Sequence, residues 1–165
     1  MFPLKPLSPS AVPAAMAKAE RYRLLGESEQ CQSICEDVLR ADPGNQPATV
    51  MLILAITDSF PHSTRDAARA MELTATLPSD YERVYYAGLV AERRARALMS
   101  HGGLSRRGAA LWLHQAMSQY ERADAMRPPD NDDARLRWNA CARVFNAHPD
   151  LLTEDDQPNA PIMLE

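Results

Sequence analysis

The sequence predicts an all-α protein, and three observations support this prediction. Small and apolar residues recur at three- and four-residue spacing along most of the 165-residue chain, as they do on one face of a helix. Alanine is abundant, whereas valine and isoleucine are sparse, and this composition favours helix over strand. No segment alternates apolar and polar residues in the way that a half-buried strand does.

Seven helical patterns follow one another along the chain, separated by short turns that contain proline or glycine. Proline cannot continue a helix, and a Ser, Asp or Asn at the turn can accept hydrogen bonds from the free N–H groups of the next helix. Because the turns are short, consecutive helices are expected to pack as antiparallel neighbours. The expected helices span residues 13–26, 28–41, 46–59, 64–77, 80–100, 106–127 and 131–147.

Three stretches of the chain can be aligned on their prolines. They are CQSICEDVLRADPGN (31–45), AARAMELTATLPSD (67–80) and MSQYERADAMRPPDN (117–131). Each contains a helical pattern with small or apolar residues on one face, then a proline and a polar turn. Repetition of helix pairs at such a period is typical of a solenoid, in which each pair packs on its neighbours.

These stretches resemble the second helices of the tetratricopeptide repeat family. The third matches best, because Met117 and Tyr120 occupy packing positions, Ala123 is the small residue and Pro128 closes the repeat. The resemblance covers residues 13 to about 147. It implies a right-handed superhelix of three antiparallel helix pairs with a C-terminal capping helix and a peptide-binding concave face. The other two repeats match more loosely, through Cys31, Cys35, Val38 and Pro43 in the first and Leu54 and Pro78 in the second.

The third helix pair is expected to be longer than the others. Pro43 and Pro78 are 35 residues apart, close to the family's repeat length, but Pro78 and Pro128 are 50 apart. Both helices of this pair are therefore predicted to gain about two turns, or roughly 11 Å each. The apolar series that continue through the extra residues are Val84, Ala87, Gly88, Ala91, Ala95 and Leu98 on the way out, and Ala109, Leu113, Ala116, Tyr120 and Ala123 on the way back.

The domain organisation follows from these patterns. Residues 1–12 form a proline-rich arm, residues 13–148 the helical repeat domain, and residues 149–165 an acidic tail that contains prolines. The last helix has no partner after it, so we expect the tail to pack on an end of the array or in the groove of a second copy, which would give a homo-oligomer. The last helix itself carries a packing stripe of Ala134, Trp138, Cys141 and Phe145.

No motif in the sequence predicts catalysis, a metal site or a cofactor. Cys31 and Cys35 are four residues apart, a spacing that could hold a metal ion, but both fall on packing positions and no histidine accompanies them. The four histidines are isolated, and no glycine-rich phosphate loop follows a strand. We therefore expect a protein that is not an enzyme.

Charge and hydropathy suggest a cytoplasmic protein without a membrane span. No run of 18 apolar residues exists, and the N-terminal residues lack the apolar segment of a secretory signal. The net charge of −4 gives no reason to expect binding along a nucleic acid.

A basic cluster is expected at the tip of the third helix pair. One interpretation is a solvated helix end. The other is a docking point for an acidic protein or another anionic partner such as RNA, since the planar guanidinium pairs with carboxylate and phosphate. No aromatic residue is interleaved with these arginines to stack on bases. The cluster consists of Arg93, Arg94, Arg96, Arg106 and Arg107.

The family resemblance also implies a binding groove on the concave face. Its asparagine and arginines resemble the family's clamp for chaperone carboxylates, although Met16 and Glu20 stand where that clamp needs lysine and asparagine. The expected function is a non-catalytic adaptor that binds a protein segment with an acidic end. The alternative is a helical module that binds RNA or another anion at the basic tip. The groove residues are Arg23, Leu54, Tyr85, Leu89, Arg135, Asn139 and Arg143.

Overall fold

The computed structural model describes residues 2–100 and 105–151, with the side chains of residues 2–100 and 108–151. These ranges contain helices and no strand, so the all-α prediction is confirmed for them. Two short 3-10 helices cover Pro9–Ala11 and Pro149–Leu151. The α-helices of the described residues are α1 (Val12–Leu24), α2 (Ser28–Ala41), α3 (Gln46–Asp58), α4 (Ala67–Ala75), α5 (Asp80–Ser100), α6 (Ser105–Ala125) and α7 (Asp133–Ala147).

The largest departure from the expected boundaries concerns α4. A helix over 64–77 was expected, whereas α4 covers only Ala67–Ala75. The residues before it form consecutive turns, in which the Ser59 carbonyl accepts hydrogen bonds from the amides of His62 and Ser63. These bonds occupy backbone groups in turns and delay the start of the helix.

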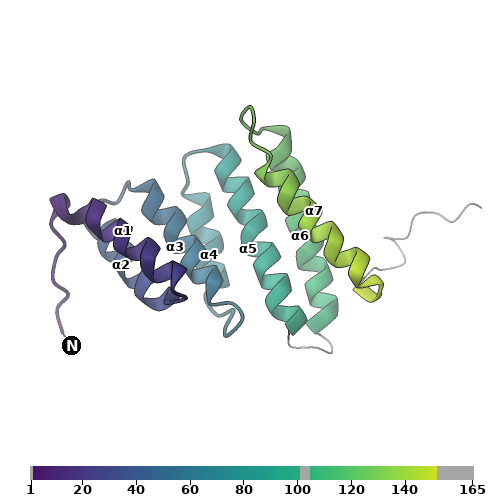
Figure 1. Ribbon diagram of the computed structural model, residues 1–165, viewed down its shortest axis with the longest axis horizontal. Helices are drawn as coiled ribbons and strands as arrows, with labels where there is room; N and C mark the ends of the chain where they lie inside the picture. The colour runs from purple at the N-terminus through teal and green to yellow at the C-terminus, as the bar shows by residue number, and fades with distance from the viewer. Residues whose placement is uncertain (1, 101–104, 152–165) are drawn as a thin grey trace, which may run out of the picture.

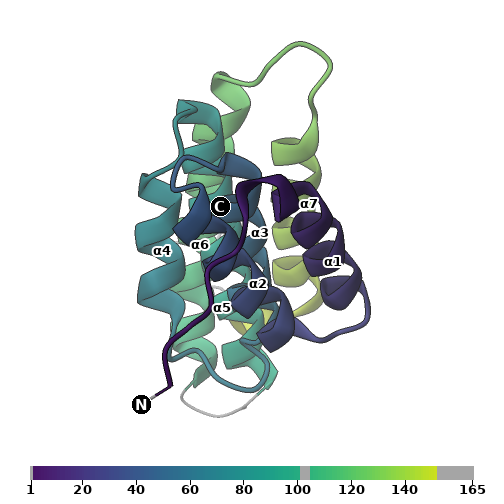
Figure 2. The same ribbon diagram turned by 90° about the vertical axis from the view of Figure 1, so that its left-hand side faces the viewer.

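The helices form a curved stack of two layers. Each helix packs against the next one in the chain, and α1, α3, α5 and α7 also pack against one another in that order. Figure 1 shows these four helices across the near side of the stack, with α2, α4 and α6 behind them. Seen from the end, α1 and α7 stand further out than α3 and α5, so this side curves inward (Figure 2). We call it the inner face.

The core consists of two clusters. The first joins α1 to α4 through Cys31, Cys35 and the apolar run of α3, and it also includes Val90 and Ala97 of α5. The second joins α5, α6 and α7, and Leu151 packs into it from beyond α7. The series expected to pack in α6 is buried, namely Ala109, Leu113, Ala116, Tyr120 and Ala123, whereas Met117 is partly buried against the same cluster.

The third helix pair is longer than the first two, as expected. Helices α5 and α6 have 21 residues each, whereas the helices of the earlier pairs have between 9 and 14. The greater length places the last turns of α5 beyond the end of α3, where they contact α6 and α7.

Gly88 allows α5 and α6 to approach closely. A Cβ atom at this position would lie 2.8 Å from Cε1 of Tyr120, a ring that is fully buried. The ring is also held at its far end, because its hydroxyl donates a hydrogen bond of 2.8 Å to Glu92. It therefore has little freedom to move away from an added methyl group.

Two glycine substitutions should therefore have opposite effects. Gly88→Ala gains about 1 kcal/mol of helix propensity but overpacks the buried Tyr120 ring at a cost of about 1–3 kcal/mol, so we expect a net loss of stability of about 1 kcal/mol. Gly108→Ala is the matched control, because its Cβ would lie 3.6 Å from the nearest atom, on Leu98. It should stabilise the protein by about 0.5–1 kcal/mol. Urea unfolding measures both changes, and a stabilising Gly88→Ala would contradict the close approach.

Candidate functional site

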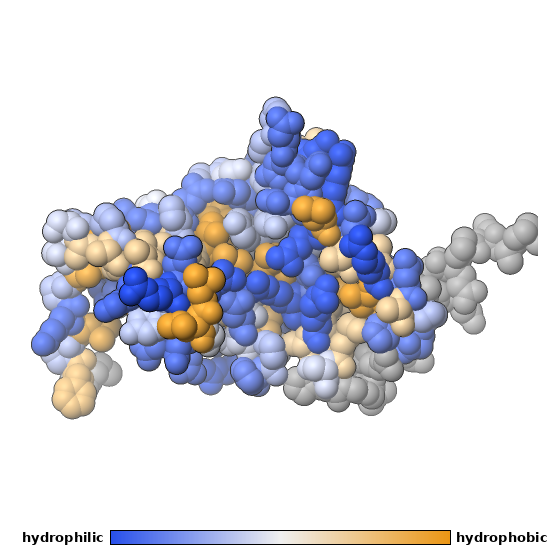
Figure 3. Space-filling view, viewed as in Figure 1, coloured by the Kyte–Doolittle hydropathy of each residue, from blue (hydrophilic) through white to orange (hydrophobic). Residues whose placement is uncertain are grey.

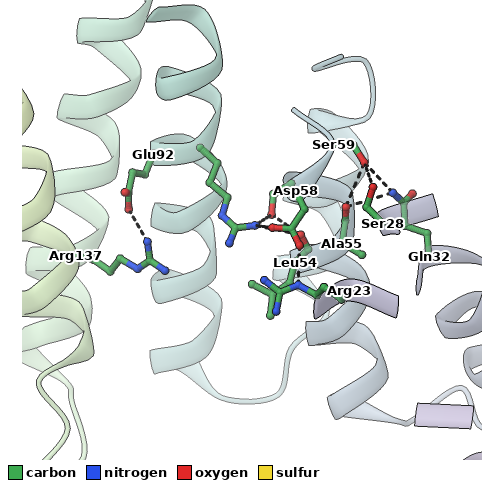
Figure 4. Close-up of polar contacts among 11 residues, drawn as sticks. Arg23, Ser28, Gln32, Leu54, Ala55, Asp58, Ser59, Glu92 and Arg137 are labelled. Atoms are coloured by element: carbon green, nitrogen blue, oxygen red, sulfur yellow. Dashed lines mark hydrogen bonds and ion pairs between the residues drawn. The ribbon is translucent and has the colours of Figure 1, made fainter. Parts of the chain in front are cut away.

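Two groups of charged side chains connect the helices of the inner face. In each group, two arginines share one carboxylate. The Asp58 group consists of Arg23, Asp58 and Arg93, on α1, α3 and α5. The Glu92 group consists of Glu92, Arg96 and Arg137, on α5 and α7. Together they link all four helices of this face (Figure 4).

Asp58 lies at the last residue of α3 and binds an arginine on each side. Its Oδ2 accepts from Nε of Arg23 at 2.7 Å, and its Oδ1 accepts from Nη1 of Arg93 at 2.5 Å. The same Nη1 donates to the Leu54 carbonyl at 3.1 Å and to Oγ1 of Thr57 at 2.7 Å. A cation is favoured there because the last carbonyls of a helix carry partial negative charge.

The members of the Asp58 group follow the period of the repeats. Arg23 and Asp58 are 35 residues apart, and so are Asp58 and Arg93. The three residues therefore occupy the same position of the repeat in three successive inner-face helices, α1, α3 and α5. Opposite charges alternate along the series, so each helix binds the next through the same position.

Glu92 is a buried carboxylate with three partners. Only 1% of its side chain is exposed. Its Oε1 accepts from Nε of Arg96 at 2.9 Å, and its Oε2 accepts from the Tyr120 hydroxyl at 2.8 Å and lies 3.6 Å from Nη1 of Arg137. A buried charge is tolerated when it is paired and hydrogen-bonded in this way. The group thus joins α5, α6 and α7.

The pKa values of the arginines reflect burial and their carboxylate partners. Burial, the largest cause, and the neighbouring charge of Arg23 lower the pKa of Arg93, although Asp58 acts to raise it. Burial also acts to lower the pKa of Arg137, but the Glu92 charge and a hydrogen bond with Tyr85 outweigh it and raise that pKa. Both guanidiniums stay charged at any ordinary pH, because arginine titrates far above neutrality.

Each group carries one positive charge that its carboxylate does not neutralise. Two guanidiniums share one carboxylate in each case, and all four arginines keep part of their side chain exposed: 26% for Arg23, 20% for Arg93, 46% for Arg96 and 38% for Arg137. The inner face is therefore locally positive, although the whole chain carries a net charge of −4. It is also largely hydrophilic, with smaller hydrophobic areas between the charged side chains (Figure 3).

Three shallow hollows adjoin these charged groups. The first lies beside Arg23, Leu24 and Asp58, and the second, of about 270 Å³, lies between the ends of α3 and α5. The third, of about 470 Å³, lies between α5 and α7. Adjacent hollows share a lining residue, Asp58 for the first two and Arg96 for the last two. They therefore form a continuous series along the C-terminal halves of the inner-face helices.

Other residues expected in the groove take different roles. Leu54 is partly exposed and contributes its carbonyl oxygen to Arg93. Tyr85 is partly buried, and its ring packs against Tyr81, Tyr86 and Tyr120. Leu89 was expected on the groove floor, but only 2% of it is exposed, because it points into the core.

The placement of α7 also differs from the expected one. Arg135 binds Asp124 of α6 at 2.9 Å, and Asn139 lines a hollow between α6 and α7. The residue that reaches the inner face is Arg137, two positions after Arg135. The difference arises because α7 buries Ala134, Cys141 and Phe145, and this orientation turns Arg135 toward Asp124 of α6 and Arg137 toward Glu92. Arg143 lines the hollow between α5 and α7 and therefore does adjoin the inner face.

The expected basic tip is not a single cluster in the described residues. Arg93 and Arg96 belong to the two carboxylate groups, and the guanidinium of Arg94 lies 4.2 Å over the ring of Trp112. The side chains of Arg106 and Arg107 lie outside the described residues. Sequence reasoning located these arginines but missed Asp58, the partner of Arg93 on α3.

The three cysteines are buried in the helix packing. Burial, as the largest cause, raises the pKa of Cys31 above 9.0 and raises the pKa of Cys35 and of Cys141 to about 12. Each thiol is thus held in its neutral form, which is the form that packs as a small apolar group. Among the described residues, no three His, Cys, Asp or Glu side chains are grouped so that they could hold a metal ion together.

None of the described helices combines the length and the apolar character that crossing a membrane requires. Comparison of the chain with models of protein families, with curated proteins and with solved structures found no significant match.

The buried thiols predict a loss of stability at alkaline pH. The folded pKa of Cys35 and Cys141, about 12, lies above the ordinary value of 9.0, so unfolding favours release of the proton. Their contribution to stability is present below pH 9 and is lost as the pH rises toward 12. Urea unfolding at pH 8 and pH 10.5 should show a lower midpoint at the higher pH. The drop should be smaller in Cys35→Ala/Cys141→Ala, and an equal drop in that variant would contradict this role of the thiols.

Proposed function

We propose that the chain is a tetratricopeptide-like repeat module that binds a segment of another protein along its inner face, without catalysis. The observation that carries this proposal is the continuous series of hollows on that face. They run across all four inner-face helices and adjoin arginines that carboxylates already hold in place. An extended segment could contact several repeats at once, as peptide ligands of helical repeats do.

The repeat character of the proposal draws support from the arrangement of the helices. Helices two apart in the chain pack side by side on the inner face, and Arg23, Asp58 and Arg93 recur there at 35-residue spacing. That spacing is close to the repeat length of the tetratricopeptide family. A right-handed superhelix closed by α7 as a cap is the arrangement we propose on this basis.

The alternative function, binding of RNA or another anion at the tip of the third helix pair, draws less support. The three described arginines assigned to the tip bind Asp58, Glu92 and the Trp112 ring. Arg93 and Arg96 line one hollow between α3 and α5, but Arg94 lies apart from them, against α6. RNA binding at the tip would require several of them to face one phosphate chain.

Site-specific photo-cross-linking in the native cell tests the proposed function. A photoreactive amino acid placed at Ala140, which lines the hollow between α5 and α7, or at Glu20, one turn before Arg23, should capture a protein partner. The same amino acid at the exposed Glu72 of α4 or Ser118 of α6 is the control, because these helices form the opposite layer.

Both inner-face positions should give a cross-linked adduct that protease degrades and nuclease does not. The control positions should give no adduct of the same molecular mass. An adduct that nuclease removes, or equal capture from all four positions, would contradict binding of a protein segment along the inner face.

A further inference from the structure

We propose that the hollow between the ends of α3 and α5 accepts a carboxylate from the bound segment, so that the partner is an acidic peptide. This proposal rests on the proposed function and specifies the chemistry of the partner. The hollow has a volume of about 270 Å³ and is lined by Thr57, Asp58, Pro61, Arg93, Arg96, Ala97 and Ser100.

The two surplus positive charges of the inner face meet at this hollow. Arg93 belongs to the Asp58 group, and Arg96 belongs to the Glu92 group. Each of these two arginines shares its carboxylate partner with a second arginine, so each group has one more positive than negative charge. Asp58 supplies the only negative charge among the described lining residues. An incoming carboxylate would neutralise charge that the fold leaves unbalanced.

Both arginines have N–H donors that no acceptor among the described residues binds. All the acceptors that Arg93 contacts bind its Nη1, and the acceptor that Arg96 contacts binds its Nε. Among the described residues, Nε and Nη2 of Arg93 and both Nη atoms of Arg96 form no hydrogen bond. A carboxylate can bind such donors in pairs, with favourable geometry.

The arginines are also held in place before any ligand arrives. Arg93 is fixed by Asp58, Thr57 and the Leu54 carbonyl, and Arg96 is fixed by the buried Glu92. Ordering a long free side chain would otherwise cost conformational entropy on binding. Much of this cost is met on folding, which favours recognition of a small anion at a defined position.

The adjacent hollow extends the same chemistry. It shares Arg96 with the first and adds Arg143, whose side chain forms no ion pair with the described residues, and His148. A segment that places one carboxylate near Arg93 and Arg96 can place a second near Arg143. We favour carboxylates of a peptide over phosphates of RNA, because the lining of the first hollow contains no aromatic ring on which a base could stack.

Selection from a random peptide library tests this proposal on the full chain. Phage displaying random dodecapeptides are panned on the immobilised protein, and the recovered peptides are synthesised with a fluorescent label. The expected peptides are enriched in Asp and Glu. Their affinity should fall several-fold when the salt concentration rises from 50 to 500 mM, because exposed charges are screened.

Substitutions locate the binding site of the recovered peptides. Arg96→Gln should weaken binding about tenfold, as expected for loss of a charge-assisted pair. Glu92 keeps Tyr120 and Arg137 as partners in this variant. Arg143→Gln, which breaks no described ion pair, should weaken binding several-fold and gives a second test if Arg96→Gln unfolds.

Arg122→Gln is the matched control, because Arg122 is exposed on α6 and binds only Gln119 among the described residues. It should leave the affinity unchanged.

The outcomes separate this proposal from the proposed function. Recovery of no binding peptide would overturn both. Peptides without acidic enrichment, or acidic peptides whose affinity is unchanged in Arg96→Gln and Arg143→Gln, would overturn the acidic partner and leave peptide binding standing. Displacement of the peptides by single-stranded RNA of equal charge at lower concentration would assign the arginines to nucleic acid and overturn the proposal. Acidic peptides that both inner-face variants weaken, with the control unchanged, would support it.

Discussion

A single carboxylate, that of Asp58, binds arginines from the helices on both sides of α3. The arrangement of the inner face depends on this interaction because it is the side-chain link shared by α1, α3 and α5. The packing of small residues brings the helices together, and Gly88 shows how close that approach is. Apolar packing is non-directional, however, whereas the paired guanidiniums specify which residues face one another. The Glu92 group has the same role between α5 and α7.

Most of the fold could be predicted from the sequence because its signals are local. Prolines end the helices, helical spacing identifies the buried faces, and the long series through Leu113 and Tyr120 predicts the lengthened third pair. The site was harder to predict, because it depends on which residues of different helices meet. The exception is the Asp58 group, since a search for opposite charges at the 35-residue period would have found it. The ion pairs of Arg135 with Asp124 and of Arg137 with Glu92 carry no such signal, because each joins two different helices without a repeat spacing.

The distribution of charge explains how an acidic chain can present a basic surface. Exposed carboxylates among the described residues lie mainly at helix starts and turns, whereas Arg23, Arg93, Arg96 and Arg143 lie in the C-terminal halves of the inner-face helices and Arg137 lies in the first half of α7. The C-terminal end of α3 carries partial negative charge, which stabilises Arg93 in the free protein. The same arginines are the groups that we propose contact a ligand. Stability and recognition therefore rely on one set of side chains, and the carboxylates of Asp58 and Glu92 hold that set in a fixed geometry.

Amide hydrogen exchange of Asp58→Asn tests the central claim most directly, because it reports the stability of each helix separately. The substitution removes the shared charge and keeps the side-chain size. We predict faster exchange in α1 and in the C-terminal half of α5, both of which lose their link to α3, with little change in α4 and α6. Asp37→Asn, which breaks an exposed pair with Arg40 on α2, should leave all these rates unchanged. Unchanged exchange in α1 and α5 of Asp58→Asn, or an equal increase in every helix, would contradict a link made by this carboxylate.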